Sequence, residues 1–398
     1  MGLKQNNILT INRGSGTLKA AMYEVTDATR LTLSIRVERT GTPEARIRIV
    51  NAASTTLFDS GVESSRADVD LEAIFAWLSE NGYISRIGAA GHRLVHGGAR
   101  YTQPQRITSE VLAELQELAR LDPDHTPEAI RGIQFIERRF PELPQVAAFD
   151  TAFHASLPKV ARMYALPRKM YDEGIRRYGF HGLSCEYILQ ELRAKDGASA
   201  EGRVIIAHLG SGSSMTAVQN GKSVDTSMGF TPLEGLVMGT RSGDVDPGAI
   251  VYLLERGKIS PEGLGALLNR DSGLLGISET SADMRDLLQR EAGDGRAAEA
   301  IDLFCYRARK YVGAYAAVLG GLDALIFSGG IGENVPQVRE RICAGLGFLH
   351  IDLDPSLNQK NAELISSPLS RVRVRVIQTD EDWMIAQHVL AVLSGTKS

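Results

Sequence analysis

The stretch VIIAHLGSGSSMTAVQNGK, from Val204 to Lys222, joins an apolar run to a Gly-Ser-Gly turn and a second strand-like run. The segment ILTINRGSGTLKAAMYE, from Ile8 to Glu24, repeats this pattern about half a chain length earlier. One isolated turn of this kind is most often an ordinary hairpin. Two copies in matching contexts indicate an internal duplication, with two such turns facing a cleft. Because glycine has no Cβ, the backbone N–H groups of these turns can approach a phosphate closely.

Composition excludes several classes of protein. The 398 residues are enough for two or three domains, and a net charge of −4 gives no reason to expect nucleic acid or an anionic membrane as partner. The three cysteines form no CxxC motif, so neither a disulfide framework nor a zinc site is expected. No apolar run is long enough to span a membrane, and Met1–Asn7 lacks the apolar region of a secretory signal. A cytoplasmic location is therefore expected.

Strand-like runs alternate with helical patterns, which predicts an α/β protein. The run RVRVRV, from Arg371 to Val376, has a period of two and predicts a strand at a sheet edge or with one solvated face. No low-complexity linker separates the halves, so a short crossing near Asp150–His154 is the expected boundary. The predicted strands are Ile8–Ile11, Leu18–Tyr23, Arg46–Val50, Val146–Phe149, Val204–Ala207, Met215–Val218, Ala324–Phe327 and Val372–Ile377.

Helix boundaries are indicated by proline caps and glycine stops. Thr126 is expected as an N-cap with Pro127 in the first helical position, and Asp246 and Pro247 repeat this device. The longest helical pattern is expected to end at Gly320.

A third glycine cluster, LIFSGGIGEN, covers Leu325–Asn334. It reads as a strand and a Gly-rich turn, followed by a helix that begins near Pro336. A helix that follows such a turn suits the phosphates of a nucleotide, or lets a base and ribose lie on the backbone. The chain contains neither GxxxxGK[ST] nor GxGxxG, so a P-loop enzyme and a standard dinucleotide-binding protein are both excluded.

Four charged residues lie in glycine-rich surroundings that are predicted as loops: Arg93, Asp150, His181 and Arg241. Each alone has an ordinary interpretation, such as a surface arginine or a structural histidine. The chain has no HExxH metal motif and no GxSxG nucleophile motif. A group rich in cations and without an obvious nucleophile indicates phosphoryl transfer, where catalysis depends mainly on positioning and charge neutralisation.

In the order of its motifs the chain closely resembles the acetate kinase (acetokinase) family of short-chain carboxylate kinases. This family belongs to the superfamily of sugar kinases, actin and heat-shock chaperone ATPases. The motifs cover nearly the whole chain: INRGSGTLK, GHRLVHGG, FDTAFH, YGFHG, HLGSGSS, GLVMGTRSGDVDP, SADMRD, SGGIGEN and TDEDWMIA.

The resemblance implies two duplicated actin-like (ribonuclease H-like) α/β domains with a nucleotide cleft between them. Residues 1–152 with 384–398 would form the N-terminal domain. Residues 153–383 would form the C-terminal domain, which would bind the nucleotide and contact a second copy in a homodimer.

The resemblance also implies roles for the charged residues. Asp150 would be the essential active-site carboxylate, while His181 and Arg241 would stabilise the phosphoryl group during transfer. Asn12 and Glu381 would help to hold Mg²⁺, with Mn²⁺ as the alternative metal, and ATP or ADP would be the co-substrate. The positions that match the family's nucleotide-binding residues are Lys19, His208, Leu209, Gly210, Ser211, Gly212, Asp283, Met284, Arg285, Gly330, Ile331, Gly332, Glu333 and Asn334.

For the substrate, the resemblance implies acetate. Arg93 would bind its carboxylate, in a pocket that Val95, Phe180 and Pro232 also line. The implied reaction is reversible transfer of the ATP γ-phosphoryl group to acetate by direct in-line displacement, which gives acetyl phosphate and ADP. Because a carboxylate is already an anion, this attack needs no general base, only relief of the repulsion between two anions.

Three alternatives stay open at this point. The acid could be propionate, butyrate or another short carboxylate, since one methylene changes binding by only about 1–3 kcal/mol. The phosphoryl donor could be pyrophosphate, although SADMRD and SGGIGEN favour an adenosine pocket. A protein of another class, a non-catalytic ATP switch of the actin or chaperone type, would leave the combination of Arg93, His181 and Arg241 unexplained.

The chain departs from the family pattern at a few positions near the expected site. Arg13 stands where Ala is usual and adds a cation beside the first turn, and Gly16 and Ser211 replace the usual Ser and Asn. Asp124 stands where Leu usually lines the methyl pocket. A carboxylate beside a methyl group is unfavourable unless it is paired or solvated. Arg13, Arg100 or a water is the expected partner of Asp124; otherwise the substrate carries a polar group.

Overall fold

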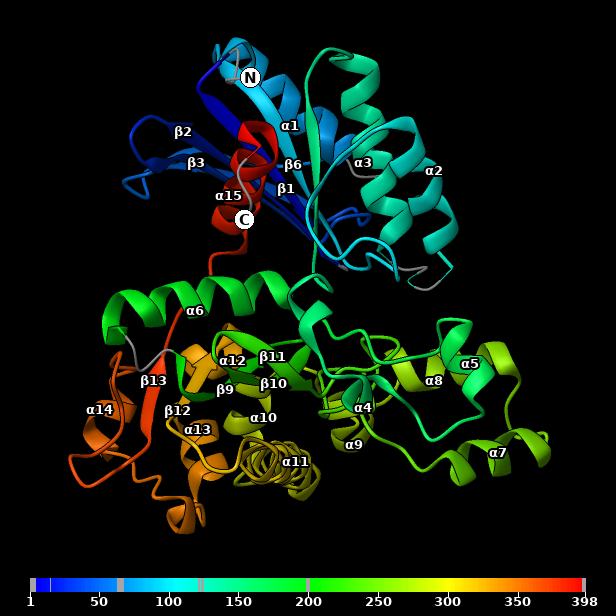
Figure 1. Cartoon of the computed structure of the whole chain (residues 1–398), viewed down its shortest axis with the longest axis vertical. Helices are drawn as coiled ribbons and strands as arrows, with labels where there is room; N and C mark the ends of the chain where they lie inside the picture. The colour runs from blue at the N-terminus through cyan, green and yellow to red at the C-terminus, as the bar shows by residue number, and fades with distance from the viewer. Residues whose placement is uncertain are drawn as a thin grey trace. The chain divides into compact units, whose positions relative to one another are not determined.

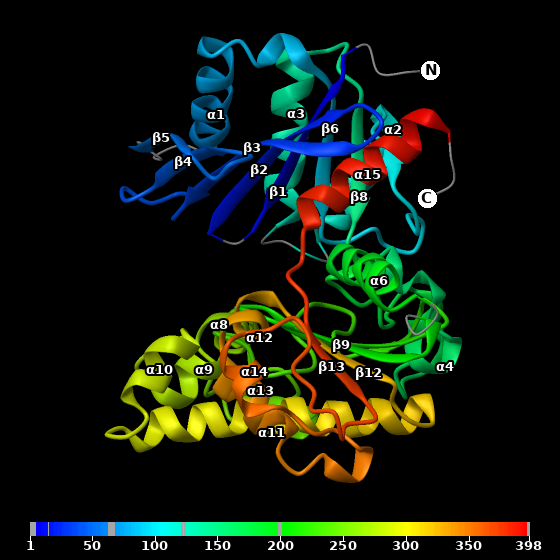
Figure 2. The same cartoon turned by 90° about the vertical axis from the view of Figure 1, so that its left-hand side faces the viewer.

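The computed structural model describes residues 5–14, 16–62, 68–120, 122, 125–197 and 201–395. The chain divides into two compact units, drawn in Figures 1 and 2: Met1–Phe153 with Asp380–Ser398, and His154–Thr379. The sequence-based division ended the second domain at residue 383. In the structure Glu381 belongs to the first unit, together with Asn12.

The first unit is built on an eight-stranded sheet of order β5-β4-β3-β2-β1-β6-β8-β7. The strands β1, β6 and β8 are parallel neighbours, and the other pairings are antiparallel. The strands are β1 (Asn7–Arg13), β2 (Thr17–Val25), β3 (Thr29–Glu38), β4 (Arg46–Asn51), β5 (Thr56–Gly61), β6 (Ile87–Leu94), β7 (Gln105–Arg106) and β8 (Gln145–Phe149). The helices are α1 (Val69–Glu80), α2 (Ser109–Leu118), α3 (Thr126–Arg139) and α15 (Glu381–Ser394), with short 3₁₀ turns η1 (Ile84–Arg86) and η2 (Phe153–Ser156).

Helices cover both faces of this sheet, because alternate residues of a strand point to opposite sides. On β1, Leu9 packs with Phe75 of α1 and Ile136 of α3, whereas Ile8 packs with Val389 of α15. Helix α15 lies so close to β6 that a Cβ on Gly91 would come within 2.6 Å of the Ile385 side chain. This close packing brings the first turn of α15 to the sheet (Figure 2).

The second unit contains a five-stranded sheet of order β11-β10-β9-β12-β13. Figures 1 and 2 show α6 on one side of this sheet and the long helix α11 on the other. The strands are β9 (Arg203–Leu209), β10 (Ser213–Gln219), β11 (Lys222–Thr226), β12 (Ala324–Ser328) and β13 (Arg373–Val376). The helices are α4 (Lys159–Arg162), α5 (Arg168–Asp172), α6 (Gly182–Asp196), α7 (Pro247–Glu255), α8 (Pro261–Arg270), α9 (Gly273–Ser278), α10 (Met284–Arg290), α11 (Gly295–Leu319), α12 (Gly329–Asn334), α13 (Pro336–Cys343) and α14 (Pro355–Gln359), with the 3₁₀ turn η4 (Gly347–Leu349).

The predicted α/β class is confirmed, as are several local predictions. The segment RVRV of β13 is an edge strand, Asp246 caps α7, and α11 ends at Gly320 in a left-handed conformation. Among the described helices, none is long and apolar enough to cross a lipid bilayer.

Two local predictions are wrong. Thr126 is the first residue of α3 and His125 is the N-cap, because the Thr126 hydroxyl donates to Asp122 Oδ2 (3.1 Å). The turn predicted between β12 and Pro336 is instead the short helix α12, which begins at Gly329 directly after the strand. Glu333 supports this helix by accepting a hydrogen bond from the Gly329 N–H (2.9 Å).

Candidate active site

In the first unit, three predicted site residues lie at the carboxyl ends of neighbouring parallel strands. Asn12 is near the end of β1, Arg93 near the end of β6, and Asp150 directly after β8. Pairing of Leu94 with Phe149 aligns the ends of β6 and β8. Carboxyl ends of adjacent parallel strands are where α/β sheets usually build sites. Arg93 is therefore a strand residue, and its predicted position in a glycine-flanked loop is wrong.

A chain of hydrogen bonds joins these residues to Glu381, the first residue of α15. Arg93 donates to Asp150 Oδ2 from both Nη2 (2.6 Å) and Nε (3.1 Å), and from Nη1 to Asn12 Oδ1 (3.3 Å). The Asn12 amide then donates to Glu381 Oε2 (3.0 Å). The side chain of Asp150 is 0% exposed and that of Arg93 is 14% exposed. Folding thus assembles four residues that are far apart in sequence.

Burial and neighbouring charges shape the ionisation of this group. Burial raises the pKa of the Asp150 carboxyl group, the Arg93 guanidinium opposes the rise, and the Glu381 carboxylate reinforces it. Burial alone would lower the pKa of Arg93, but Asp150 and Glu381 raise it overall, so Arg93 stays charged. Asp150 Oδ1 is buried and has no hydrogen-bond partner among the described residues. An unpartnered buried carboxylate oxygen next to a second carboxylate favours a cation.

The carboxylates of Asp150 and Glu381 suit Mg²⁺ better than a metal ion whose ligands are all protein side chains. The described residues contain no group of three or more His, Cys, Asp or Glu side chains that could hold a metal ion. Mg²⁺ characteristically takes one or two carboxylates and completes its shell with waters and substrate phosphates. Asp150 and Glu381 fit that pattern, whereas both amide atoms of Asn12 are already hydrogen-bonded, to Arg93 and Glu381.

Sequence reasoning missed acidic and histidine residues beside this group. His125 Nδ1 lies 2.8 Å from Asp122 Oδ1. Burial raises the pKa of Asp150, and His125 is a minor influence in the opposite direction. Asp382 accepts from the Thr10 hydroxyl (3.2 Å). Burial raises the pKa of Asp382 to about 6, and Lys19 opposes the rise. The His within LDPDHTP and the acidic run at the start of α15 were the available sequence signals.

Lys19 and Val95 complete the predicted residues of the first unit. Lys19 is exposed on β2, paired with Asn12 across the antiparallel ladder. Val95 follows β6 and is buried. Asp124 lies outside the described residues.

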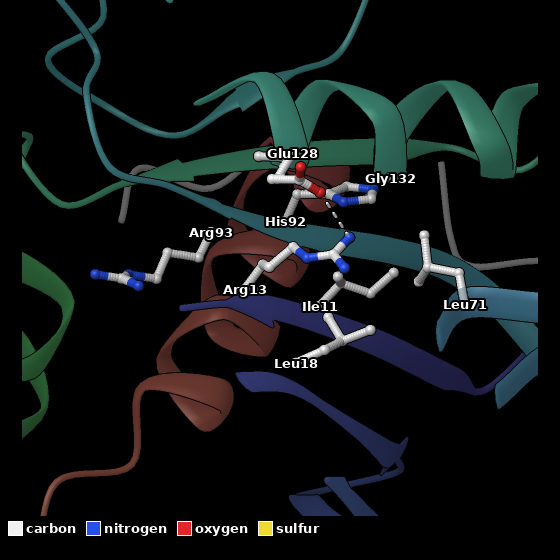
Figure 3. Close-up of a pocket in the computed structure, with 9 residues that line it drawn as sticks. Ile11, Arg13, Leu18, Leu71, His92, Arg93, Glu128 and Gly132 are labelled. Carbon is white, nitrogen blue, oxygen red and sulfur yellow. Dashed lines mark ion pairs between the residues drawn. The ribbon is translucent and has the colours of Figure 1, made fainter. Parts of the chain in front are cut away.

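The guanidinium of Arg13, which the sequence predicts as an added cation beside the first turn, is paired with two carboxylates. It pairs with Asp70 of α1 (3.0 Å) and Glu128 of α3 (3.2 Å). Figure 3 shows this side chain between β1 and α3, at a cavity of about 10 Å³, while the Arg93 side chain points away from Glu128. Arg100 pairs with Glu114 (2.6 Å). Both arginines expected to pair with Asp124 therefore have other carboxylate partners.

In the second unit, His181 and Arg241 converge on the β9–β10 turn. A Cβ added to Gly212 would lie 3.6 Å from His181 Nε2 and 3.7 Å from Arg241 Nη1. His181 caps α6 in a left-handed conformation, and its Nδ1 lies 2.9 Å from the Ser214 hydroxyl. Its ring packs against His208, with centroids 4.3 Å apart. Nitrogen atoms of a histidine and an arginine side chain thus lie close to one glycine of the β9–β10 turn.

Arg241 belongs to residues 227–246, here called the Arg241 loop, which contains no helix or strand. Arg241 Nη1 donates to the Pro232 carbonyl (3.3 Å), and the Gly239 N–H donates to the Ser211 carbonyl (3.1 Å). The predicted residues Pro232, Arg241 and Ser211 are therefore neighbours.

Phe180, another predicted residue of the substrate pocket, is buried, and its carbonyl accepts a hydrogen bond from His154 Nε2 (2.9 Å).

The β9–β10 turn packs against α12. A Cβ on Gly329, whose φ is +76°, would lie 2.6 Å from the Leu209 carbonyl oxygen, so only glycine fits there. A Cβ on Gly210 would lie 3.9 Å from the Gly330 nitrogen. This brings two predicted nucleotide-binding segments together, the turn from His208 to Gly212 and the helix that contains Gly330, Ile331, Gly332, Glu333 and Asn334.

Some predicted nucleotide-binding side chains also have partners within the protein. Asn334 donates to the Gly330 carbonyl (3.1 Å) and stabilises its own helix. Asp283 caps α10 and pairs with Arg285 (2.7 Å), while Met284 is buried in the core. The segment before Asp283 still lies beside the Arg241 loop, because a Cβ on Gly239 would come within 3.3 Å of the Ala282 carbonyl oxygen.

The chain is similar to known proteins over nearly its whole length. The model of the acetokinase family matches residues 7–387. An acetate kinase from Methylocella silvestris is 46% identical over 97% of this chain and 98% of its own length. A propionate kinase from Citrobacter rodentium is 42% identical over 97% of both chains. The crystal structure of Porphyromonas gingivalis acetate kinase superposes with a TM-score of 0.88 at 38% identity, covering 98% of this chain and 100% of that one.

Proposed function

Because this chain belongs to the acetokinase family, we propose that it transfers the γ-phosphoryl group of ATP reversibly to acetate, giving acetyl phosphate and ADP. The observation that carries the proposal is the convergence of His181 Nε2 and Arg241 Nη1 on Gly212. Donors aimed at one point of a glycine turn can stabilise charge that develops on a phosphoryl group. The family supplies the class of acceptor, a short-chain carboxylate.

Arg93 would bind the carboxylate of the acid. The described structure uses three of its N–H groups, two toward Asp150 and one toward Asn12. A guanidinium has five N–H donors, which leaves two for a substrate oxygen. Asp150 and Asn12 would keep the guanidinium plane oriented, so that the acid enters with its carboxylate toward the phosphorus.

The chemistry needs cations more than a base. Acetate is already ionised, so the barrier is the repulsion between its carboxylate and the triphosphate. Arg93 would neutralise the acid, while His181 and Arg241 would stabilise the oxygens of the phosphoryl group in transfer. Asp150 Oδ1 and Glu381 would hold Mg²⁺ together with the phosphates, and the bound ion would supply charge neutralisation and orientation of the donor.

The nucleotide would use the β9–β10 turn, α12 and the start of α10. The backbone of the turn would contact the phosphates, and the glycines of α12 would let the adenosine approach the main chain. Lys19 of the first unit would add a positive charge near the phosphates.

Propionate is a second candidate acceptor, because a propionate kinase is also a near relative. One additional methylene is worth about 0.8 kcal/mol of apolar burial, so the same residues could accept either acid. Shape at the methyl pocket would decide the preference.

Trapping of the acyl phosphate with hydroxylamine tests the function directly. The enzyme would be incubated with ATP, Mg²⁺ and acetate, propionate, butyrate or glycolate, with a sample lacking acid as control. We expect hydroxamate from acetate at the highest kcat/KM. Turnover of glycolate far above acetate would overturn the acetate assignment. If hydroxamate formed when pyrophosphate was the phosphoryl donor but not when ATP was, the assignment of ATP as the donor would be overturned.

We also propose a homodimer formed through α7 and α8. The sequence of α7, PGAIVYLLE, is strongly apolar, yet neither helix contains a buried residue. Val251 and Tyr252 are 49% and 51% exposed, and in Figure 1 these helices lie away from the sheet of their own unit. Exposed apolar patches usually mark interfaces. Light scattering after gel filtration should give a dimer, and Val251→Asp should give a monomer; a monomeric parent protein would contradict the proposal.

A further inference from the structure

The Arg241 loop is held both by backbone hydrogen bonds and by a group of polar side chains. Its residues form no helix or strand, yet it carries both Arg241 and the Pro232 carbonyl that accepts from it. Loops that position functional groups must be held by contacts from a rigid scaffold. Backbone hydrogen bonds join residues 238–242 of this loop to residues 268–275, such as Ser242 N–H to the Leu268 carbonyl (3.0 Å). The contacts that hold the earlier part of the loop, which includes Pro232, centre on Arg177, Glu234 and Tyr164.

Arg177 holds the start of the loop. Its Nη1 donates to three successive carbonyls, those of Thr226 (3.0 Å), Ser227 (3.1 Å) and Met228 (3.1 Å). Its Nη2 donates to Glu234 Oε1 (2.5 Å). The Arg177 side chain is 17% exposed. One guanidinium therefore links the end of β11 to a carboxylate in the middle of the loop.

Tyr164 holds the same carboxylate from the other side. Its hydroxyl donates to Glu234 Oε2 and accepts from the Phe230 N–H (2.8 Å). Burial, reinforced by the Glu234 carboxylate, raises the pKa of Tyr164, so the hydroxyl remains a donor. A Cβ on Gly229 would lie 1.6 Å from Glu234 Oε2. Any side chain at residue 229 would therefore clash with the carboxylate.

The loop closes next to Glu234. The Gly235 N–H donates to Asp244 Oδ1 (2.9 Å), and the Asp244 N–H donates to the Gly235 carbonyl (3.0 Å). Tyr311 of α11 donates to Asp244 Oδ2 (2.7 Å). The enclosed segment contains Arg241. Glu234 thus lies at the base of this closed segment and two residues after Pro232.

We propose that Glu234, with Arg177 and Tyr164, is a positioning residue that holds Arg241 over Gly212. The inference rests on the proposed function, in which Arg241 contacts the phosphoryl group. Without the carboxylate, Arg177 loses its charged partner inside the unit and its hold on the loop weakens. The Pro232 carbonyl then shifts, and with it the guanidinium that it orients. A displacement of about 1 Å at a catalytic group can cost about 10²-fold in rate.

Glu234→Gln isolates the charge, because glutamine has nearly the same volume. We expect kcat to fall about 30-fold, within the range for misplacement of a transition-state contact. The KM for ATP should change less than about 3-fold, since Arg241 acts chiefly in the transition state. Tyr164→Phe removes only one hydroxyl and should give a smaller loss of kcat with the same unchanged KM.

Asp323→Asn is the matched control. Asp323 also forms a two-point pair with an arginine of this unit, Arg203 (2.6 Å and 3.0 Å). That pair lies at the amino ends of β9 and β12, the opposite ends of these strands from the Gly210 turn. We expect kcat to stay within about 2-fold of the parent enzyme.

A double substitution separates positioning of Arg241 from general weakening of the unit. Arg241→Ala should retain ATP binding and lose more than about 10²-fold in kcat. In the Arg241→Ala background, Glu234→Gln should cause no further loss, because its effect passes through Arg241. An equal loss in both backgrounds would overturn the inference, as would normal kcat in Glu234→Gln alone. Nearly normal turnover of Arg241→Ala would instead overturn the proposed role of Arg241. Circular dichroism would check that each variant is folded.

Discussion

The two glycine turns look alike in sequence but have different surroundings. In the first unit the Gly14 N–H donates to the Thr17 carbonyl (2.8 Å), and a Cβ on Gly16 would meet nothing within 4 Å. In the second unit, Gly212 lies against His181 and Arg241. The two turns therefore share a sequence pattern, but the candidate functional side chains lie in different places around them. The first unit gathers them at strand ends, and the second gathers them at the turn itself.

The candidate site arginines of the two units, Arg93 and Arg241, are also held by different kinds of contact. Arg93 is paired with a fully buried carboxylate, that of Asp150, which directly follows the next strand. The described contacts of Arg241 include a backbone carbonyl and a methionine sulfur, at 3.3 Å from Pro232 and 4.0 Å from Met238. A charge held by another buried charge should be most sensitive to neutralisation of its partner. A charge held by a loop should be most sensitive to loop geometry. The following predictions test this difference.

Asp150→Asn should have the largest effect. It keeps the shape of the side chain but leaves Arg93 without its buried carboxylate and removes the unpartnered Oδ1 charge. We expect kcat/KM to fall by at least about 10³-fold in steady-state assays. Fluorescence reports whether the first unit is folded, because both tryptophans, Trp77 and Trp383, belong to it. A folded variant with more than a tenth of parent activity would contradict the role of Asp150.

Gly212→Ala and Gly16→Ala form a matched pair for the two turns. The alanine methyl at residue 212 would occupy the space next to His181 Nε2 and Arg241 Nη1, so kcat/KM for ATP should fall about 10²-fold. At residue 16 the methyl has open space, and the change should stay within about 3-fold. Gly212 has no positive φ and a Cβ on Gly16 would meet nothing within 4 Å, so both variants should fold. Equal losses would mean that the two turns contribute alike, and the comparison would fail.

Each unit also contains a buried histidine, His92 or His154, whose burial lowers its pKa to about 4. An unfolded histidine binds a proton below about pH 6.5, whereas these native ones stay neutral down to about pH 4. The unfolded state therefore binds more protons in this window, and stability is lost as pH falls. We expect each histidine to remove about 2 kcal/mol of its unit's stability between pH 7 and pH 5.

Substitution of one histidine at a time tests this assignment. His92→Gln should flatten the pH dependence of urea unfolding followed by tryptophan fluorescence, which reports only the first unit. His154→Gln should leave that fluorescence transition unchanged and alter only the transition seen by circular dichroism. An identical effect of both substitutions on fluorescence would show that the units unfold together.

Arg285→Ala should have the smallest effect. Arg285 is exposed and pairs with Asp283 of its own helix, and both match nucleotide-binding positions of the family. An exposed contact that is not part of the transition state should affect binding more than turnover. We expect the KM for ATP to rise about 3-fold with kcat unchanged, in the same assay. A loss of kcat comparable to that of Gly212→Ala would give this arginine a catalytic role.

The sequence predicted many of the candidate site residues, but it predicted less well whether they lie on strands, helices or turns. Arg93 lies on a strand that sequence patterns did not reveal, because IGAAGHRL of β6 contains small residues and glycine where a typical strand has branched ones. Those small residues admit α15, a contact that no local pattern predicts. The helix α12 was read as a turn for a similar reason, since three glycines in six residues argue against a helix.

The amino-acid sequence by itself determined the duplicated strand–turn–strand pattern, the edge strand, the capped helices and the residues that resemble those of a carboxylate kinase. These depend on local periodicity, glycine conformation and motif order, which are properties of short segments. Only the tertiary structure decided that Asn12, Arg93, Asp150 and Glu381 form one hydrogen-bonded chain, and that Arg13 pairs inward with Asp70 and Glu128. Such pairings depend on which strand ends and helices become neighbours. That is settled by burial of the whole core, which brings together residues that are distant in sequence.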